Sequence, residues 1–176
     1  MSVMDRLTHA ANKMAEQMSG DDSGSKADIL DTLKQDHRDV AELLERLVDS
    51  DSATERNLLL ASIRTALIPH LRAEERVVYE AVVGLRGNEQ KQHGDEGYLE
   101  HDLADKMLAT LGRVGNAMSP EFAAASKVLK ELVEHHVKEE ETHIWADVED
   151  NFSDAERIAM NRKFLAAKSR VRVPSA

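Results

Sequence analysis

The sequence contains no cysteine, which excludes disulfide bonds, thiolate metal sites and cysteine nucleophiles. Proline and aromatic residues are scarce, with three prolines and an aromatic content of 3% in 176 residues. Alanine, leucine, glutamate and lysine are abundant instead, and this composition favours helices over a β-rich fold. A chain of this length can bury a core of its own within one domain.

Long apolar runs and excess positive charge are also missing. No stretch reaches the roughly 18–20 apolar residues that a membrane span needs, and no signal-peptide core is present. We therefore expect a cytoplasmic protein, and the absence of cysteine suits a reducing compartment. The formal net charge of −10 repels nucleic acid and anionic lipid. We expect neither nucleic acid nor membrane as a partner, and the sequence leaves the oligomeric state open.

A pattern of histidine and glutamate occurs twice. The segment HLRAEERVVYEAV begins at His70, and HVKEEETHIWADV begins at His136. They match at the histidine, at two consecutive glutamates, at an aromatic residue and at a final valine. A second pair precedes them, with DHRDVAELLERL from Asp36 and EHDLADKMLATL from Glu100. The chain is therefore a doubled unit of two helices, in which one histidine precedes an HxxxE motif.

Apolar residues recur at helical spacing through four long segments. Asp28 is a good N-cap for the first, and Ser119-Pro120 gives the fourth an N-cap followed by proline at the first helical position. Ser153 and Glu156 form a capping box that opens a final helix of about 16 residues. The predicted long helices cover about 28–48, 52–83, 96–114 and 119–150, with a long glycine-rich loop at 84–97.

These elements predict an all-α fold, an up-down-up-down four-helix bundle with short extra helices at both ends. An N-terminal amphipathic helix at 2–19 and a linker make up residues 1–26. The bundle then covers residues 27–150, and the C-terminal helix and tail cover 151–176. Four long helices packed side by side leave a long interior in which one polar layer can lie between apolar layers.

Each of the four helices carries a histidine on its apolar face. Residues four apart on a helix lie one turn apart, about 6 Å along the axis, so two of the helices present an imidazole and a carboxylate together. Buried carboxylates without partners cost several kcal/mol each, and two metal ions would neutralise them. Imidazole and carboxylate without sulfur suit iron, manganese or zinc. The predicted ligands are His37, His70, Glu74, His101, His136 and Glu140.

The pattern H…HxxxE…H…HxxxE, with a second glutamate after each spaced one, resembles the hemerythrin-like HHE cation-binding family over about residues 28–150. The resemblance implies a non-haem centre of two oxo- or hydroxo-bridged iron ions, with Glu74 and Glu140 as bridging ligands and the histidines as terminal ligands. It also implies dioxygen, hydrogen peroxide or nitric oxide as the small ligand. Oxygen carriers of this family have a further histidine four residues after the one at 101, where this chain has Asp105.

Several neighbours of these ligands have two interpretations. Asp105 either replaces the missing histidine or orients His101. Tyr98 offers a phenolate or a hydrogen bond to a bound oxygen species, although a tyrosine at the boundary of the core is the simpler interpretation. His143 either orients a ligand, which we predict, or is an additional metal ligand itself, and we predict that His93 faces solvent. A single histidine on an apolar face is usually a satisfied core residue, but six ligand-type residues at a repeated spacing favour a metal site.

The number of predicted protein ligands favours some of the functions that this family allows over others. Four histidines and two bridging glutamates leave open positions on both ions, and a carboxylate at position 105 would favour the ferric state. We therefore predict a di-iron oxidoreductase of peroxidase or catalase type, acting in oxidative or nitrosative stress. The alternatives are a reversible dioxygen carrier or sensor and an iron storage or delivery protein. Repair-type relatives carry a cysteine that this chain lacks, and a metal-free interaction bundle is the non-catalytic alternative.

Overall fold

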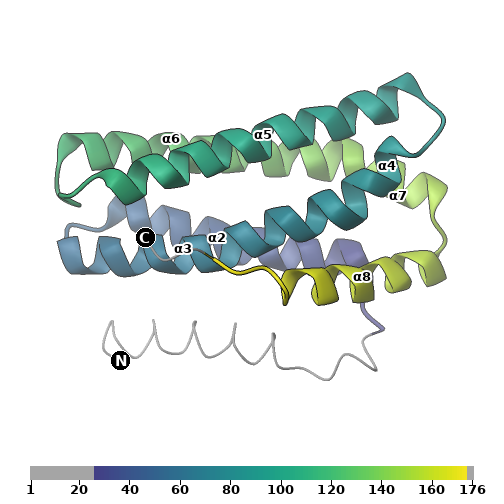
Figure 1. Cartoon of the computed structure of the whole chain (residues 1–176), viewed down its shortest axis with the longest axis horizontal. Coiled ribbons are helices and arrows are strands. Elements are labelled where there is room, and N and C mark those ends of the chain that lie inside the picture. The colour runs from purple at the N-terminus through teal and green to yellow at the C-terminus, as the bar shows by residue number, and fades with distance from the viewer. Residues whose placement is uncertain (1–25, 174–176) are drawn as a thin grey trace.

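The computed structural model describes residues 26–173, and helices account for almost all of them, with no strand in this part of the chain. The predicted all-α class is therefore confirmed. Four long helices lie side by side along the molecule (Figure 1): α2 (Ile29–Asp49), α3 (Ala53–Glu74), α5 (Asn88–Arg113) and α6 (Pro120–Glu139). Within the same residues, no helix is both long and apolar enough to cross a membrane. The predicted helix at 2–19 lies outside the described residues.

Shorter helical segments extend two of the long helices. The π-helical turn η1 (Glu75–Tyr79) and helix α4 (Glu80–Val83) continue α3. In the same way, η2 (Glu140–Ile144) and α7 (Trp145–Asn151) continue α6, before the separate helix α8 (Asp154–Lys168). A π-helical turn holds one residue more than an α-helical turn and often marks a functional site. Here each turn begins at or directly after the glutamate of an HxxxE motif.

The predicted starts of α2, α6 and α8 are confirmed. The Asp28 side chain accepts a hydrogen bond from the backbone N–H of Leu30, and Ser119 accepts one from Phe122. At the start of α8, the Glu156 carboxylate accepts a hydrogen bond from the Ser153 backbone N–H at 2.8 Å. These contacts satisfy N–H groups that the first helical turn leaves without a partner.

The predicted loop at 84–97 is wrong, because only residues 84–87 connect α4 to α5. Four glycines suggested a loop, but two of them, Gly94 and Gly97, lie buried inside α5. A Cβ atom at Gly97 would lie 2.7 Å from the ring of Tyr79, and one at Gly94 would lie 2.4 Å from the Cγ2 atom of Val83. These glycines therefore allow α5 to approach η1 and α4 closely.

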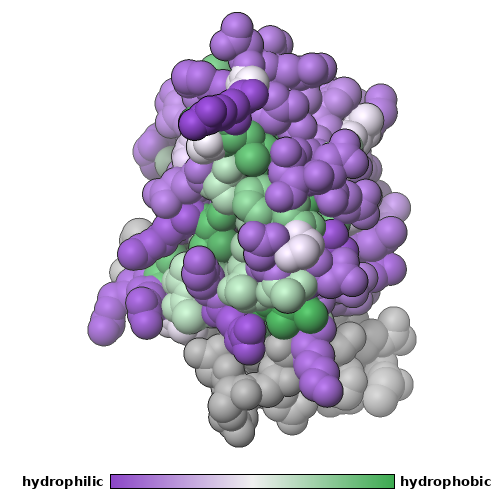
Figure 2. All heavy atoms as spheres, turned by 90° about the vertical axis from the view of Figure 1, so that its right-hand side faces the viewer, coloured by the Kyte–Doolittle hydropathy of each residue, from purple (hydrophilic) through white to green (hydrophobic). Residues whose placement is uncertain are grey.

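The interior consists of two apolar clusters with a polar layer between them. The larger cluster fills the end of the bundle near Leu47, Leu59 and Phe122, and the smaller one surrounds Ile29 and Val148 at the other end. Figure 2 shows this second end, where apolar side chains reach the surface inside a hydrophilic margin. The six predicted ligands form the polar layer, so packed apolar side chains lie on both sides of them.

Helix α8 closes the side of the bundle formed by α2 and α3 (Figure 1). Its buried residues Met160 and Phe164 belong to the smaller cluster. Arg157 donates to the Asp28 carboxylate at 2.6 Å, and the Asn161 amide donates to the Ala27 carbonyl at 3.0 Å. The C-terminal helix is therefore tied to the start of α2.

Candidate metal centre

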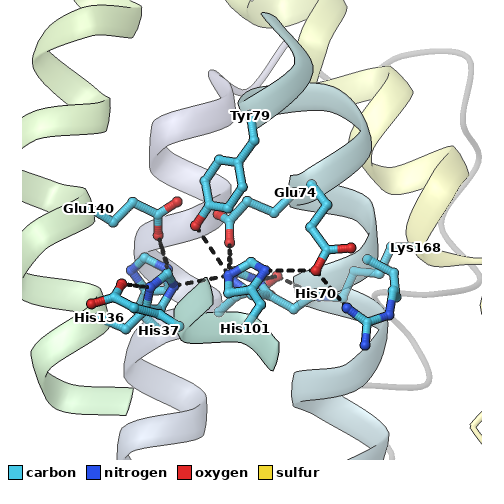
Figure 3. Close-up of polar contacts among 12 residues, drawn as sticks. His37, His70, Glu74, Tyr79, His101, His136, Glu140 and Lys168 are labelled. Carbon is cyan, nitrogen blue, oxygen red and sulfur yellow. Dashed lines mark hydrogen bonds and ion pairs between the residues drawn. The ribbon is translucent and has the colours of Figure 1, made fainter. Parts of the chain in front are cut away.

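The structure brings the six predicted ligands together in one buried layer. Each long helix contributes a histidine, and the two glutamates come from the C-terminal end of α3 and the first position of η2. All six residues are at most 6% exposed. Figure 3 shows their imidazole and carboxylate groups converging on the axis of the bundle. The six are His37, His70, Glu74, His101, His136 and Glu140.

These residues form two overlapping groups that share Glu74. One group adds His37 and His70, and the other adds His101 and His136; within each group the ligand atoms lie within 4.8 Å of one another. The Glu74 Oε2 atom lies 3.3 Å from His70 Nε2 and 3.5 Å from His101 Nε2. Each group thus has two imidazoles and a carboxylate, which is a donor set for one cation.

Glu140 contacts the same two groups from the opposite side. Its Oε2 atom lies 3.2 Å from His37 Nε2 and 3.7 Å from His136 Nε2. Glu74 contacts one histidine of each group as well, so the two glutamates are related as the repeat predicts. Both carboxylates are therefore placed to connect two neighbouring cation positions.

Four further carboxylates hold the outer nitrogens of the histidines. In each imidazole, Nδ1 lies near a carboxylate and Nε2 points to the centre, which is the arrangement that orients histidine toward metal ions. These four contacts were not predicted, although in the sequence an acidic residue precedes His37 and His101 and follows each motif glutamate. The pairs are His37 with Glu141 at 3.2 Å, His70 with Asp36 at 3.0 Å, His101 with Glu75 at 3.1 Å, and His136 with Glu100 at 2.8 Å.

The centre contains buried polar atoms that lack partners. Both carboxylate oxygens of Glu74, both of Glu140 and the Nε2 atom of His37 are buried without a hydrogen bond. Their short contacts with neighbouring groups do not have hydrogen-bond geometry. A buried charged atom without a partner costs several kcal/mol. Cations at the two groups would satisfy these atoms, so the residues present fit a pair of metal ions.

Charge coupling within the layer shifts its pKa values strongly. Burial alone lowers the pKa of His70, but the carboxylates of Glu74 and Asp36 outweigh it and raise the pKa to about 10. Burial alone raises the pKa of Glu74, but His70 and His101 hold that pKa well below its usual range. A proton on His70 therefore balances the Glu74 carboxylate when no metal is bound, and a cation would replace that proton.

Tyr79 belongs to the centre and was not predicted as a site residue. Its fully buried hydroxyl lies 3.1 Å from His101 Nε2. Burial and the charges of Glu140 and Glu74 raise the pKa of Tyr79 well above its usual range, so the hydroxyl keeps its proton. The repeat places Trp145 at the equivalent position, where its ring stacks on His37 with a centroid distance of 6.0 Å. The aromatic position of the repeat was the signal, and of the two residues Tyr79 is the one whose polar atom contacts a predicted ligand, while the buried Trp145 Nε1 has no hydrogen-bond partner in the described part of the chain.

Tyr98 and Asp105 lie away from the centre. The Tyr98 hydroxyl donates to the backbone carbonyl of Glu75 at 3.0 Å, so it offers no phenolate to the site. Asp105 forms an ion pair with Arg72, and Arg72 contacts the Glu75 carboxylate at 2.6 Å. Asp105 therefore neither replaces the missing histidine nor contacts His101, because Glu75 occupies the position beside that imidazole.

The two histidines at the edge of the layer also differ from expectation. The His143 side chain is 46% exposed and pairs with Glu139, so it does not orient a ligand. His93 was predicted to face solvent, but its side chain is only 16% exposed and its Nδ1 lies 2.8 Å from Asp147 Oδ2. The two rings stack with a centroid distance of 4.9 Å. This pair lies beside the centre without belonging to it.

A small pocket leads from this histidine pair to the centre. Its volume of about 20 Å³ is enough for one water-sized molecule. Tyr79, His136 and Glu140 form part of its wall, and so do His93 and His143. The pocket therefore connects the centre with the edge of the bundle between α5 and η2.

Comparison with known proteins agrees with this geometry. The family model described as hemerythrin HHE cation binding domain matches residues 28–148. A DNA nickase from Nostoc sp. (strain PCC 7120) is 25% identical over 169 residues, which are 96% of this chain and 47% of that protein. The chain thus spans about half the length of this relative. No solved structure matches the chain significantly.

Proposed function

Because the chain belongs to the hemerythrin HHE cation-binding domain family, we propose that it is a non-haem di-iron protein that reduces or disproportionates peroxide or dioxygen species. The family domain binds metal cations, and the two groups of histidine and glutamate supply donors for them. Iron suits imidazole and carboxylate donors, and manganese or zinc would fit the same set. The frame we propose is the up-down-up-down arrangement of α2, α3, α5 and α6.

The residues divide naturally between two ions. His37 and His70 would hold one ion, His101 and His136 would hold the other, and both glutamates would bridge them. When bound, such a pair of ions supplies electrons and polarises a small oxygen species. The chain itself orients the four imidazoles through the carboxylates on their Nδ1 atoms, and excludes most water by burial.

The position of the Tyr79 hydroxyl favours an enzyme over a reversible carrier. The Tyr79 hydroxyl faces both the His101 imidazole and the small pocket, so a proton donor lies where a small ligand would bind. Reduction of peroxide to water consumes protons, whereas reversible dioxygen release does not. Asp105 does not add to this preference as a ligand, because its carboxylate is paired with Arg72.

The test is to load the protein with ferrous iron, measure metal content and near-ultraviolet absorption, and follow hydrogen peroxide consumption. We expect two irons per chain and peroxide consumption that falls in Tyr79→Phe while both irons remain bound. Reversible uptake and release of dioxygen gas, with no peroxide consumption, would instead show a carrier. Purified protein that takes up no metal would show an interaction bundle.

DNA cleavage is the second candidate, because it is the activity in the name of the Nostoc relative. The net charge of −10 opposes binding to a phosphate backbone, and this chain matches less than half of that protein. We therefore place it behind the redox function. Incubation of metal-loaded protein with supercoiled plasmid is the direct check, and appearance of nicked circles would reverse the order.

A further inference from the structure

One histidine outside the polar layer is held in the same way as the four predicted ligands. The Nδ1 atom of His93 lies 2.8 Å from Oδ2 of Asp147, whose carboxylate is buried. The Gln90 amide donates to the other oxygen of Asp147 at 3.0 Å, so this carboxylate is fixed in place. A carboxylate on Nδ1 keeps the imidazole proton there and leaves the Nε2 lone pair for a metal ion. His93 therefore has the orientation of a metal ligand.

His143 places a second imidazole beside this one. His93 belongs to α5 and His143 to η2, and these two elements pack together. The two rings stack with a centroid distance of 4.9 Å, and His143 Nε2 lies 3.3 Å from Glu139 Oε2. Two imidazoles with a carboxylate close by are donors for a divalent transition metal.

The small pocket joins this pair to the centre. Both histidines line it, and so do His136 and Glu140, which are predicted ligands. Both carboxylate oxygens of Glu140 are buried without a hydrogen bond within the described residues. Buried carboxylate oxygens without partners favour a cation beside them. A cation at the histidine pair therefore has further donors ahead of it along the pocket.

The charges at the pocket also favour the approach of cations. Glu96, Glu100 and Glu139 line it, and the net charge of −10 raises the concentration of cations near the surface. A divalent cation arrives with bound water, and the volume of about 20 Å³ holds only one water-sized particle. Imidazoles at the edge can replace part of that water before the cation moves inward.

We propose that His93 and His143 form an outer site for a divalent transition-metal cation, through which cations are loaded into the centre. This inference rests on the proposed pair of ions and adds their route of entry. The outer site offers two imidazoles, whereas each group of the centre offers two imidazoles and the buried, unpartnered carboxylate of Glu74. Cations are therefore held less tightly at the outer site and pass on to the centre.

Cobalt(II) is a suitable probe because it takes the same donors as iron and zinc and absorbs visible light when bound. In stopped-flow loading of the metal-free protein, we expect His93→Gln to slow uptake about tenfold, an effect of about 1.4 kcal/mol on the barrier. Two ions per chain should still be bound after loading is complete and the protein is desalted, because the six ligands of the centre are unchanged.

His135→Gln is the matched control. The His135 side chain is 58% exposed and pairs with Glu100. The same substitution there removes a histidine close to the centre but leaves the pair at the pocket intact. We expect its uptake rate to stay within about twofold of the wild-type rate.

A second measurement locates the outer site directly. Crystals of protein that already holds two irons are soaked in cobalt(II), and anomalous scattering at the cobalt edge should show a cation beside His93 and His143. No cobalt there, an unchanged uptake rate in His93→Gln, equal slowing in the His135→Gln control, or loss of an ion from His93→Gln at completion would overturn this inference alone. Failure of the wild-type protein to hold two ions would overturn the proposed function as well.

Discussion

At the scale of single residues, the centre depends on pairs of side chains, each an imidazole held by a carboxylate. Each imidazole offers Nε2 to the interior because a carboxylate holds its Nδ1 atom. Removing one of the six predicted ligands therefore leaves buried charges without compensation. Removing a neighbour such as His143 leaves the six side chains in place. This difference separates ligands from neighbours in an experiment.

Truncation of a ligand tests that distinction. We expect His70→Ala and Glu140→Ala each to lose binding of two irons per chain, because one removes a terminal donor and the other a bridging carboxylate. His143→Ala is the control, since its side chain is 46% exposed and lies outside the layer. Metal analysis by mass spectrometry decides the matter; two irons in either ligand variant would contradict the assignment.

Protonation of His70 makes the metal-free protein sensitive to pH. Because its pKa in the folded state is raised to about 10, this residue stabilises the fold fully below its ordinary pKa of about 6.5. That contribution is lost as the pH rises from about 6.5 toward 10. We expect the free energy of unfolding of metal-free protein, from urea titrations, to fall over this range. His70→Gln should show a flatter profile; an equally steep one would assign the effect to other groups.

At the scale of elements, close approach between helices shapes the centre. The π-helical turns η1 and η2 begin directly after and at the motif glutamates, and Tyr79 at the end of η1 lies beside His101. Helix α5 reaches η1 only because Gly97 has no side chain to meet the Tyr79 ring. The contact between these two elements therefore sets both the position of the tyrosine and the width of the pocket.

Substitution of Gly97 is expected to lower the free energy of unfolding. Gly97→Ala should lower the free energy of unfolding by about 1–3 kcal/mol, because the added Cβ meets the Tyr79 ring in a packed core. Gly112→Ala in the same helix should raise it by about 0.5 kcal/mol, since its Cβ meets only an ordinary contact at 3.7 Å and alanine favours helix. Urea unfolding of both variants gives the comparison, and equal shifts would rule out the steric argument.

At the scale of the whole molecule, the polar layer divides the core into two apolar clusters. Helix packing on either side holds the layer together despite its charge. The net charge of −10 opposes compaction of the metal-free chain. Bound cations would relieve this repulsion and join all four long helices.

Metal removal should therefore weaken the fold. We expect chelator to lower the midpoint of thermal unfolding, because ligand at 100 times its Kd stabilises the native state by about 2.7 kcal/mol. His70→Ala provides the control, since chelator should lower the unfolding midpoint less in a chain that cannot bind two ions. Scanning calorimetry with and without chelator measures the difference, and an unchanged midpoint in the wild-type protein would favour a metal-free bundle.

The sequence by itself determined the helical class, the capped helix starts and the six predicted ligands of the polar layer. Capping by Asp28 and Ser119 and the four-residue spacing of His70 and Glu74 are local properties, governed by hydrogen bonds and geometry within one turn. The repeat then supplied the second pair of helices. These features were therefore predictable without any knowledge of how the helices meet.

Only the tertiary structure decided which groups meet across helices. Gly97 suggested a loop but serves close packing, Asp105 pairs with Arg72, and Tyr79 rather than Tyr98 enters the centre. Each outcome depends on how far apart two helices lie and how each is rotated about its axis. Those quantities arise from packing between residues distant in sequence, so the sequence pattern identifies the donor residues while packing determines their neighbours.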